Sequence, residues 1–298
     1  MWKGFNIIVV NKTREIRWLK TVMLIQFTKM HGLGNDFVVI DAISQQVDLT
    51  GEQIKAIADR HFGVGCDQLL LVEKSTDARA EFGYRIFNAD GGEVEQCGNG
   101  ARCFALFVRQ QGLTTNDVIS VVTSSGLIEL VVKADQVTVN MGVPNFNPDS
   151  LPFLQDNRTE TYDLVVNDTV YAIGAVSMGN PHAVMMVEDV DDIDVDVLGQ
   201  AIESHPMFPN RVNAGFMQIV NRNEIRLRVY ERGVGETKAC GTGACAAVAV
   251  GRMLNRLDEQ VTTHLHGGDL NISWSGEGSV LLMTGPATTV FQGNINCE

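Results

Sequence analysis

The sequence has no long hydrophobic run, no CxxC pair and no excess of basic residues. No stretch of its 298 residues approaches the roughly 18 apolar residues that cross a bilayer, and the apolar run at 5–10 is too short for a secretory signal. We therefore expect no membrane span and a cytoplasmic location. The 23 basic residues are outnumbered by 36 acidic ones, which gives a formal net charge of −13. Such a charge argues against nucleic acid and anionic membranes as partners.

The six cysteines follow no regular framework. They stand at positions 66, 97, 103, 240, 245 and 297. Without a CxxC pair, the spacing predicts neither a disulfide scaffold nor a zinc site, and we expect most of these residues to be free thiols.

Residues 1–22 differ from the remainder in charge. Five basic residues and one acid give this segment a charge of +4, which leaves −17 on the rest of the chain. Because it lacks the Ser-rich composition of a transit peptide, we predict an N-terminal extension without a catalytic role. The total length exceeds one ordinary compact domain and favours two.

An internal repeat supports the two domains. Residues 85–101 match residues 228–244 without gaps at seven of seventeen positions, with an offset of 143 residues. A second landmark agrees, because Gly34-Asn35 has a counterpart 145 residues later in Gly179-Asn180. Such a repeat indicates two halves of common design. We expect the first half to span 23–141 and the second 142–284.

Strands dominate the expected secondary structure. Alternation of apolar and polar residues predicts seven strands between 24 and 140 and eight between 162 and 283. Four helices are expected, at Thr50 with a capping box, near 196–204, at 99–111 and at 242–254. The last two are apolar on nearly every side, so each should lie in the middle of its half and be wrapped by curved sheet.

Cys97 and Cys240 stand out because each precedes Gly-x-Gly-Ala and begins one of these buried helices. A lone cysteine is more often an inert buried hydrophobe, so the repeated context carries the functional interpretation. Unpaired N–H groups and the positive dipole end of a helix favour a thiolate. The amides of Gly98-Asn99 and Gly241-Thr242 can also hold a carboxylate.

A pseudo-twofold axis between the halves would make the two helix ends face each other across the interdomain cleft. A small carboxylate bound there presents its α-carbon to both sulfurs, one on each side. One thiolate can remove the α-proton while the other thiol returns a proton, which inverts the stereocentre. Because the helix ends stabilise the enediolate-like charge that develops, this chemistry needs neither a cofactor nor a metal. We therefore predict an isomerase with its active site in the cleft.

Seven dispersed motifs resemble the diaminopimelate epimerase family. They are KMHGLGNDF (29–37), GVGCDQ (63–68), RIFNADG (85–91), CGNGAR (97–102), MGNPH (178–182), YERG (230–233) and ACGTGA (239–244). The resemblance runs in order from about Leu24 to the C-terminus.

The resemblance implies a metal-free interconversion of LL- and meso-diaminopimelate without pyridoxal phosphate, in bacterial lysine and peptidoglycan-precursor synthesis. It implies an α/β (α+β) fold of two pseudo-symmetric domains, each a mainly antiparallel, barrel-like sheet around a central helix. Residues 285–298 are implied to return to the first half as a strand. The implied assembly is a homodimer.

Matching the motifs also assigns the site. Cys97 and Cys240 become the acid–base pair, and the reacting carboxylate is held by Gly98, Asn99, Gly241 and Thr242. The other implied substrate-lining residues are Asn35, Gln68, Asn88, Asn180, Asn213, Glu231 and Arg232. Among them Arg232 suits the distal carboxylate, because a guanidinium fork matches carboxylate geometry.

His182 and Glu231 are implied helpers that orient or deprotonate the thiols. A hydrogen-bonded structural histidine is the alternative for His182, and an acidic partner for Arg232 is the alternative for Glu231.

Three other functions stay open. A proline-type racemase of the same superfamily would not need the asparagines and the arginine that suit a second carboxylate. A thiol sensor or oxidoreductase would use the two cysteines as a redox pair, although no CxxC motif favours it. A noncatalytic binding protein would need the asparagines and the arginine but not both sulfurs.

Overall fold

The computed structural model describes residues 23–94, 98–123 and 126–297. The predicted extension at 1–22 and Cys97 therefore lie outside the described residues. In the ranges that are described, no helix is long and apolar enough to span a membrane.

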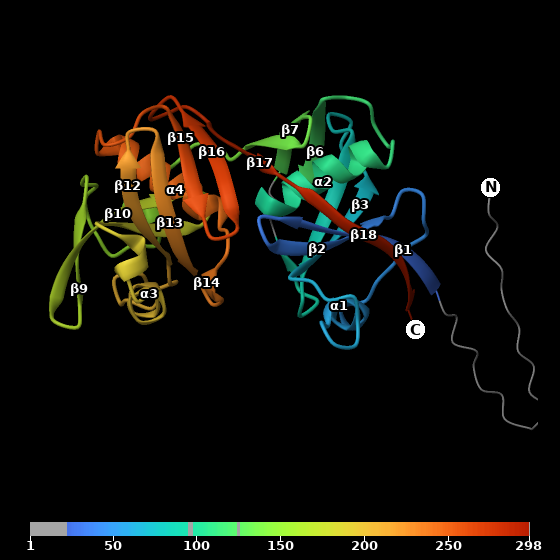
Figure 1. Ribbon diagram of the computed structural model, residues 1–298, viewed down its shortest axis with the longest axis horizontal. Coiled ribbons are helices and arrows are strands. Elements are labelled where there is room, and N and C mark those ends of the chain that lie inside the picture. Colours follow the sequence, from blue (N-terminus) through green and yellow to red (C-terminus); the bar gives the residue numbers. More distant parts are fainter. Residues whose placement is uncertain (1–22, 95–97, 124–125, 298) are drawn as a thin grey trace, which may run out of the picture.

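The chain forms two lobes, which Figure 1 shows side by side. The first lobe contains β1 (Met23–Gly32), β2 (Asn35–Asp41), α1 (Gly51–Ala58), β3 (Gln68–Lys74), β4 (Phe82–Asn88), β5 (Glu93–Val94), α2 (Gly98–Gln110), β6 (Val118–Thr123), β7 (Gly126–Lys133) and β8 (Gln136–Asn140). The second contains β9 (Tyr162–Val166), β10 (Thr169–Ser177), β11 (Pro181–Val187), α3 (Val195–Glu203), β12 (Asn213–Asn221), β13 (Glu224–Glu231), β14 (Gly235–Thr237), α4 (Gly241–Met253), β15 (Gln260–Leu265) and β16 (Gly268–Trp274). The strand β17 (Leu281–Pro286) links the lobes, and β18 (Thr288–Cys297) returns to the first (Figure 1).

The strand pairing repeats from one lobe to the other. Parallel pairs β2–β3 and β4–β6 in the first lobe correspond to β11–β12 and β13–β15 in the second. The remaining strand pairs are antiparallel, including β18 beside β1 and β9 beside β10. The equivalent strands β8 and β17 pair with each other in antiparallel register, as a twofold relation requires. The expected α/β fold class is thereby confirmed, while the exact domain boundaries stay a prediction that this pairing supports.

The helices α2 and α4 lie in the interior of the lobes, as their apolar composition predicts. Every residue of α2 from Gly98 to Val108 is buried, and so is every residue of α4 from Gly243 to Gly251. Small residues allow strands to approach closely: a Cβ added at Gly174 would come within 2.3 Å of Val250. The sheet can therefore wrap each helix tightly.

Two short strands were not expected from the sequence. They are β5, with two residues, and β14, with three. Such segments are too short to show an alternating pattern. Their pairing with β4 and β13 is a consequence of the tertiary fold, which brings the chain back just before each central helix.

Candidate active site

The N-terminal ends of α2 and α4 meet at Met283 of β17. A Cβ added at Gly98 would lie 2.8 Å from the Met283 Cε atom, and one added at Gly241 would lie 3.1 Å from its Sδ atom. The same added Cβ at Gly241 would lie 3.8 Å from Oδ1 of Asn99. The structure thus brings the predicted carboxylate-holding segments of both halves together. Because Cys97 lies outside the described residues, the geometry of the two sulfurs stays a prediction.

Cys240 is the N-cap residue of α4. Its backbone is extended, with φ −110° and ψ 108°, and its Sγ accepts the backbone N–H of Gly243 at 3.4 Å. The Thr242 hydroxyl lies 3.6 Å from the same sulfur. The side chain is buried, so this sulfur is held by the first turn of the helix and shielded from bulk water.

The expected lowering of the Cys240 pKa is wrong. Burial and the carboxylate charge of Glu231 raise the pKa of Cys240 well above its ordinary value, and the hydrogen bonds from Thr242 and Gly243 only partly oppose this rise. A helix end stabilises a nearby anion only modestly. Burial removes the hydration of a thiolate, and a second anion beside it repels its charge, so both effects favour the thiol. In this conformation Cys240 is therefore the protonated thiol.

Glu231 lies at the end of β13, next to Cys240. Burial raises its pKa, while hydrogen bonds from Thr237 and Cys240 lower it. The Thr237 hydroxyl donates to Oε1 of Glu231 at 2.5 Å. Arg232 is directed elsewhere, because its guanidinium donates to the Asn210 carbonyl at 3.2 Å. The contacts therefore connect Glu231 with the thiol.

A hydrogen-bond series connects His182 with the same thiol. Nε2 of His182 lies 3.0 Å from Oδ1 of Asn180, and Nδ2 of Asn180 donates to the Thr242 hydroxyl at 3.4 Å. Burial lowers the pKa of His182 to about 3, with a further contribution from the charge of Arg232. The imidazole is neutral at physiological pH and reaches the sulfur only through two other residues. Its contacts are those of a buried histidine that is hydrogen-bonded to Asn180, and its role as a helper of the thiols stays a prediction.

The remaining predicted residues fall into two groups. Gln68 donates from Nε2 to Oδ1 of Asn88 at 2.9 Å, and its own Oε1 is buried without a partner among the described residues. That oxygen is available to a hydrogen-bond donor on a ligand. Asn213 instead binds the backbone at both ends of its amide, since it donates to the Pro181 carbonyl and accepts the Arg232 N–H, each at 2.9 Å. Asn213 therefore fixes the position of Arg232.

Arg102 is a residue that sequence reasoning missed. It is fully buried in α2 and donates to Oδ1 of Asn99 at 2.8 Å and to the Pro286 carbonyl at 3.1 Å. The available signal was a charged residue in the first turns of an otherwise apolar helix, because a buried guanidinium requires partners.

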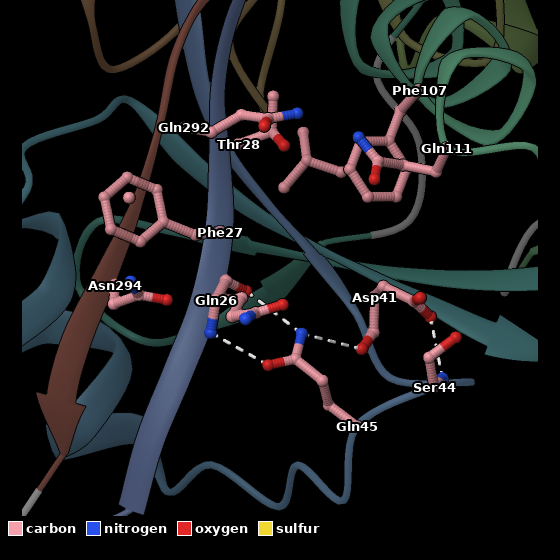
Figure 2. A pocket seen from close by; sticks show the side chains of 12 residues that line it. Gln26, Phe27, Thr28, Asp41, Ser44, Gln45, Phe107, Gln111, Gln292 and Asn294 are labelled. Carbon is pink, nitrogen blue, oxygen red and sulfur yellow. Dashed lines mark hydrogen bonds between the residues drawn. The ribbon is translucent and has the colours of Figure 1, made fainter. Parts of the chain in front are cut away.

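A separate pocket of about 310 Å³ lies at the other end of α2 (Figure 2). Its lining residues are Gln26, Phe27, Thr28, Val39, Asp41, Ser44, Gln45, Phe107, Gln111, Gln292, Gly293 and Asn294. Gln45 donates to the carbonyls of Gln26 and Asp41 at 3.1 and 3.2 Å. The thirteen residues of α2 span roughly 18 Å, so this pocket is distinct from the Gly98 end. Among the described residues, no three His, Cys, Asp or Glu side chains are grouped to hold a metal ion.

Two similar lobes with a helix N-terminus from each at one site define a two-domain fold of the epimerase and racemase type. A hydroxyproline epimerase from Agrobacterium vitis has this fold, with a TM-score of 0.67 at 16% identity over 94% of both chains. A Bacillus anthracis phenazine biosynthesis protein of the PhzF family gives a TM-score of 0.64 at 16% identity, covering 92% of this chain and 99% of that one. At such identities the likeness concerns the fold alone.

The chain belongs to the diaminopimelate epimerase family, whose model matches residues 27–147 and 174–290. A diaminopimelate epimerase of Thioalkalivibrio sulfidiphilus is 61% identical over 277 residues, which cover 92% of this chain and 100% of that protein. One of Chromobacterium violaceum is 61% identical over 274 residues, covering 92% of this chain and 99% of that protein.

Proposed function

We propose that the protein inverts one stereocentre of diaminopimelate and so interconverts the LL and meso isomers. The observation that carries the proposal is the meeting of two helix N-termini at Met283, in a chain of the diaminopimelate epimerase family. Cys240 caps one helix, and Cys97 directly precedes Gly98, the first residue of the other. This reaction serves lysine and peptidoglycan-precursor synthesis.

The proposed reaction is a two-base proton transfer without a cofactor. The reacting carboxylate binds the amides of Gly98-Asn99 and Gly241-Thr242, which stabilise the negative charge that develops when the α-proton leaves. In one direction Cys97, as thiolate, takes that proton while Cys240, as thiol, gives its own to the opposite face. Atoms and charge balance, because one proton is removed and one returned. The raised pKa of Cys240 supports the donor role in this direction.

The rest of the substrate would be held by the polar residues around the helix ends. Buried Oε1 of Gln68 suits an ammonium group, which is a donor without an acceptor. The exposed Arg232, held by Asn213, suits the distal carboxylate. Glu231 would take the proton of Cys240 when that residue acts as the base.

The test is proton exchange at the α-carbon. Purified protein is incubated with LL-diaminopimelate in D₂O without pyridoxal phosphate, and the α-proton signal and the isomer ratio are followed by NMR. We expect deuterium incorporation with inversion, and loss of inversion in Cys97→Ala and Cys240→Ala. Cys245→Ala is the matched control, because this buried helical thiol lies outside the site. Unchanged epimerisation in either of the first two variants would refute the two-base mechanism.

The same assay separates the alternatives. Proline in place of diaminopimelate should show no exchange, and exchange of proline would favour the racemase. Activity that requires oxidised thiols would favour a redox protein, so the reaction is run with and without reductant.

We further propose a cytoplasmic homodimer. The five described cysteines, at 66, 103, 240, 245 and 297, are thiols rather than disulfides, which suits a reducing compartment. On β18, Val290 and Phe291 are half exposed, and they offer an apolar surface for a second copy. Analytical ultracentrifugation of the wild type and of Phe291→Asp tests this assembly, and a wild-type monomer would contradict it.

A further inference from the structure

A series of side-chain hydrogen bonds runs from the surface of the first lobe to the helix ends. Asn35 donates from Nδ2 to Oδ2 of Asp67 at 3.0 Å. Asn99 donates from Nδ2 to Oδ1 of Asn35 at 3.2 Å. Arg102 donates from Nη2 to Oδ1 of Asn99 at 2.8 Å. Two amides are thus held between a carboxylate and a guanidinium.

The two end groups fix the direction of the whole series. An amide side chain has a donor and an acceptor end, and rotation by half a turn exchanges them. An ionised carboxylate can only accept and a guanidinium can only donate. One orientation of Asn35 and one of Asn99 therefore satisfies all three bonds. Any reversal would oppose two donors or two acceptors, which is most costly at Asn99 and Arg102, because both are buried.

The Asp67 end is anchored by an ion cluster. Arg60 donates to Oδ1 of Asp67 at 2.6 Å and forms a fork with both oxygens of Asp36, at 2.8 and 3.1 Å. Lys29 donates to Asp36 at 2.5 Å and also to the Gly65 carbonyl. Burial raises the pKa of Asp36, but the hydrogen bonds from Arg60 and Lys29 lower it by more, so that it lies far below its usual range. Asp36 therefore stays ionised at neutral pH and holds Arg60 beside Asp67.

The Arg102 end is anchored by the backbone at the link between the lobes. Besides Asn99, the fully buried guanidinium donates to the carbonyls of Pro286 at 3.1 Å and of Gly98 at 3.4 Å. Pro286 ends β17, and Gly98 begins α2. Arg102 therefore ties the first turn of α2 to the strand on which both helix ends converge.

Asn99 extends the series into the second lobe. Its Nδ2 also donates to the carbonyl of Ala239 at 3.2 Å, and Ala239 immediately precedes Cys240. The Asn99 amide therefore connects the first turn of α2 with the residue that precedes the cap of α4. The charged residues at the two ends of this series belong to the first half of the internal repeat. In the second half, Val212 corresponds to Asp67 and Cys245 corresponds to Arg102, and both are fully buried.

We propose that Asp67 and Arg102 are positioning residues for the epimerisation proposed above, on which this inference rests. They fix the amide orientations of Asn35 and Asn99 and thereby the alignment of the two helix ends around the α-carbon. Small errors in this alignment lower the reaction rate strongly, because the reacting atoms must already lie close to their transition-state arrangement.

The test compares Asp67→Asn with Asp59→Asn. In Asp67→Asn the new side-chain amide adds a hydrogen-bond donor at this position. The amide of Asn35 is then no longer restricted to one orientation. Asp59 is a matched control, because it is an acid close to Asp67 in the sequence, and within the described ranges its side chain accepts hydrogen bonds from the backbone N–H groups of His61 and Phe62, each at 2.7 Å. We expect kcat/KM for diaminopimelate to fall at least tenfold in Asp67→Asn, with a raised KM and an unchanged Tm. Asp67→Glu, which keeps an acceptor-only end, should recover most of the loss.

The outcomes are distinguishable from failure of the proposed function. An inactive wild type refutes the function, whereas an active wild type with Asp67→Asn equal to Asp59→Asn overturns the positioning role. A lower Tm and a smaller active fraction with an unchanged KM would also overturn it, because that pattern marks a merely structural residue. Should Asp67→Asn fail to fold, neutron diffraction of the wild type decides: deuterons on Asn35 Nδ2 must face Asp67, and those on Asn99 Nδ2 must face Asn35.

Discussion

The carboxylate of Glu231 and the thiol of Cys240 interact at the buried N-terminal end of α4, where each shifts the pKa of the other. The pair combines a base and an acid, and each changes the proton affinity of the other. A negative charge beside a thiol disfavours the thiolate, so the thiol form is favoured in this conformation. In the proposed mechanism, proton transfer to the substrate or to Glu231 then creates the thiolate.

Glu231→Gln should therefore lower the pKa of Cys240. Removing the carboxylate removes a charge that, after burial, raises this pKa, so the thiolate fraction rises at every pH below the wild-type pKa. We expect the midpoint of Cys240 alkylation to move toward lower pH. Mass spectrometry of the Cys240 peptide after iodoacetamide treatment measures it. Asp196→Asn, an exposed acid of α3, is the control, and an equal midpoint in the two variants would contradict the coupling.

Cys240→Ser separates the chemistry of the sulfur from its capping role. Serine is a preferred N-cap and can accept the Gly243 N–H that Cys240 accepts now. Its hydroxyl is too weak an acid to replace the thiol, so epimerisation should fall by about 10²–10⁴-fold while the Tm stays close to wild type. Cys240→Ala should lose the cap as well, at about 1 kcal/mol of folding free energy. Calorimetry and the exchange assay check both variants, and a Cys240→Ser enzyme with near wild-type rates would contradict the acid–base role.

The sequence was most informative where a pattern extends over several turns of structure. The apolar stretches at 99–111 and 242–254 differ by one residue at each end from α2 and α4. The pKa direction of Cys240 was not predicted, because it depends first on how completely the sulfur is buried and then on the charge of Glu231, which belongs to a different element. The role of Arg102 was hidden for the same reason, since its partners include Pro286, far away along the chain.

His264 should make the stability of the second lobe depend on pH. Its imidazole lies 2.8 Å from Asp269 and 2.9 Å from Glu224. The hydrogen bond with Asp269 is the largest cause of its raised pKa; burial opposes the rise, and Glu224 adds to it. A pKa that is higher in the folded state stabilises the fold fully below the unfolded value of 6.5, and this stabilisation is lost as the pH rises through the folded value.

The measurement is the urea midpoint of the wild type and of His264→Gln. The urea midpoint of the wild type should exceed that of the variant by a larger margin at about pH 6 than at about pH 9. The reason is that an unperturbed histidine titrates between these two pH values. In a background with Asp269→Asn and Glu224→Gln, the substitution should give the same difference at both pH values. A difference that grows with pH in the native background would show that the sign is wrong.

Gly267 should control how the tip of the first lobe docks on the second. A Cβ added there would lie 1.9 Å from the carbonyl oxygen of Leu33, which is backbone and cannot rotate away. Leu33 is buried in the β1–β2 hairpin, two residues before Asn35. Gly267→Ala should therefore separate the hairpin from the β15–β16 turn and displace Asn35 from Asn99. We expect epimerisation to fall at least tenfold, because the aligned helix ends lose part of their support.

Gly51→Ala is the matched control for this substitution. A Cβ there would meet its nearest neighbour, the Gly91 carbonyl oxygen, at an ordinary 3.5 Å. Small-angle X-ray scattering and the exchange assay are applied to both variants. The Gly267 variant should be less compact and less active, and the Gly51 variant should match wild type. If the Gly267 variant keeps full activity, the contact with Leu33 does not hold the hairpin in its active position, and other contacts between the lobes, such as the strand pair β8–β17, align them.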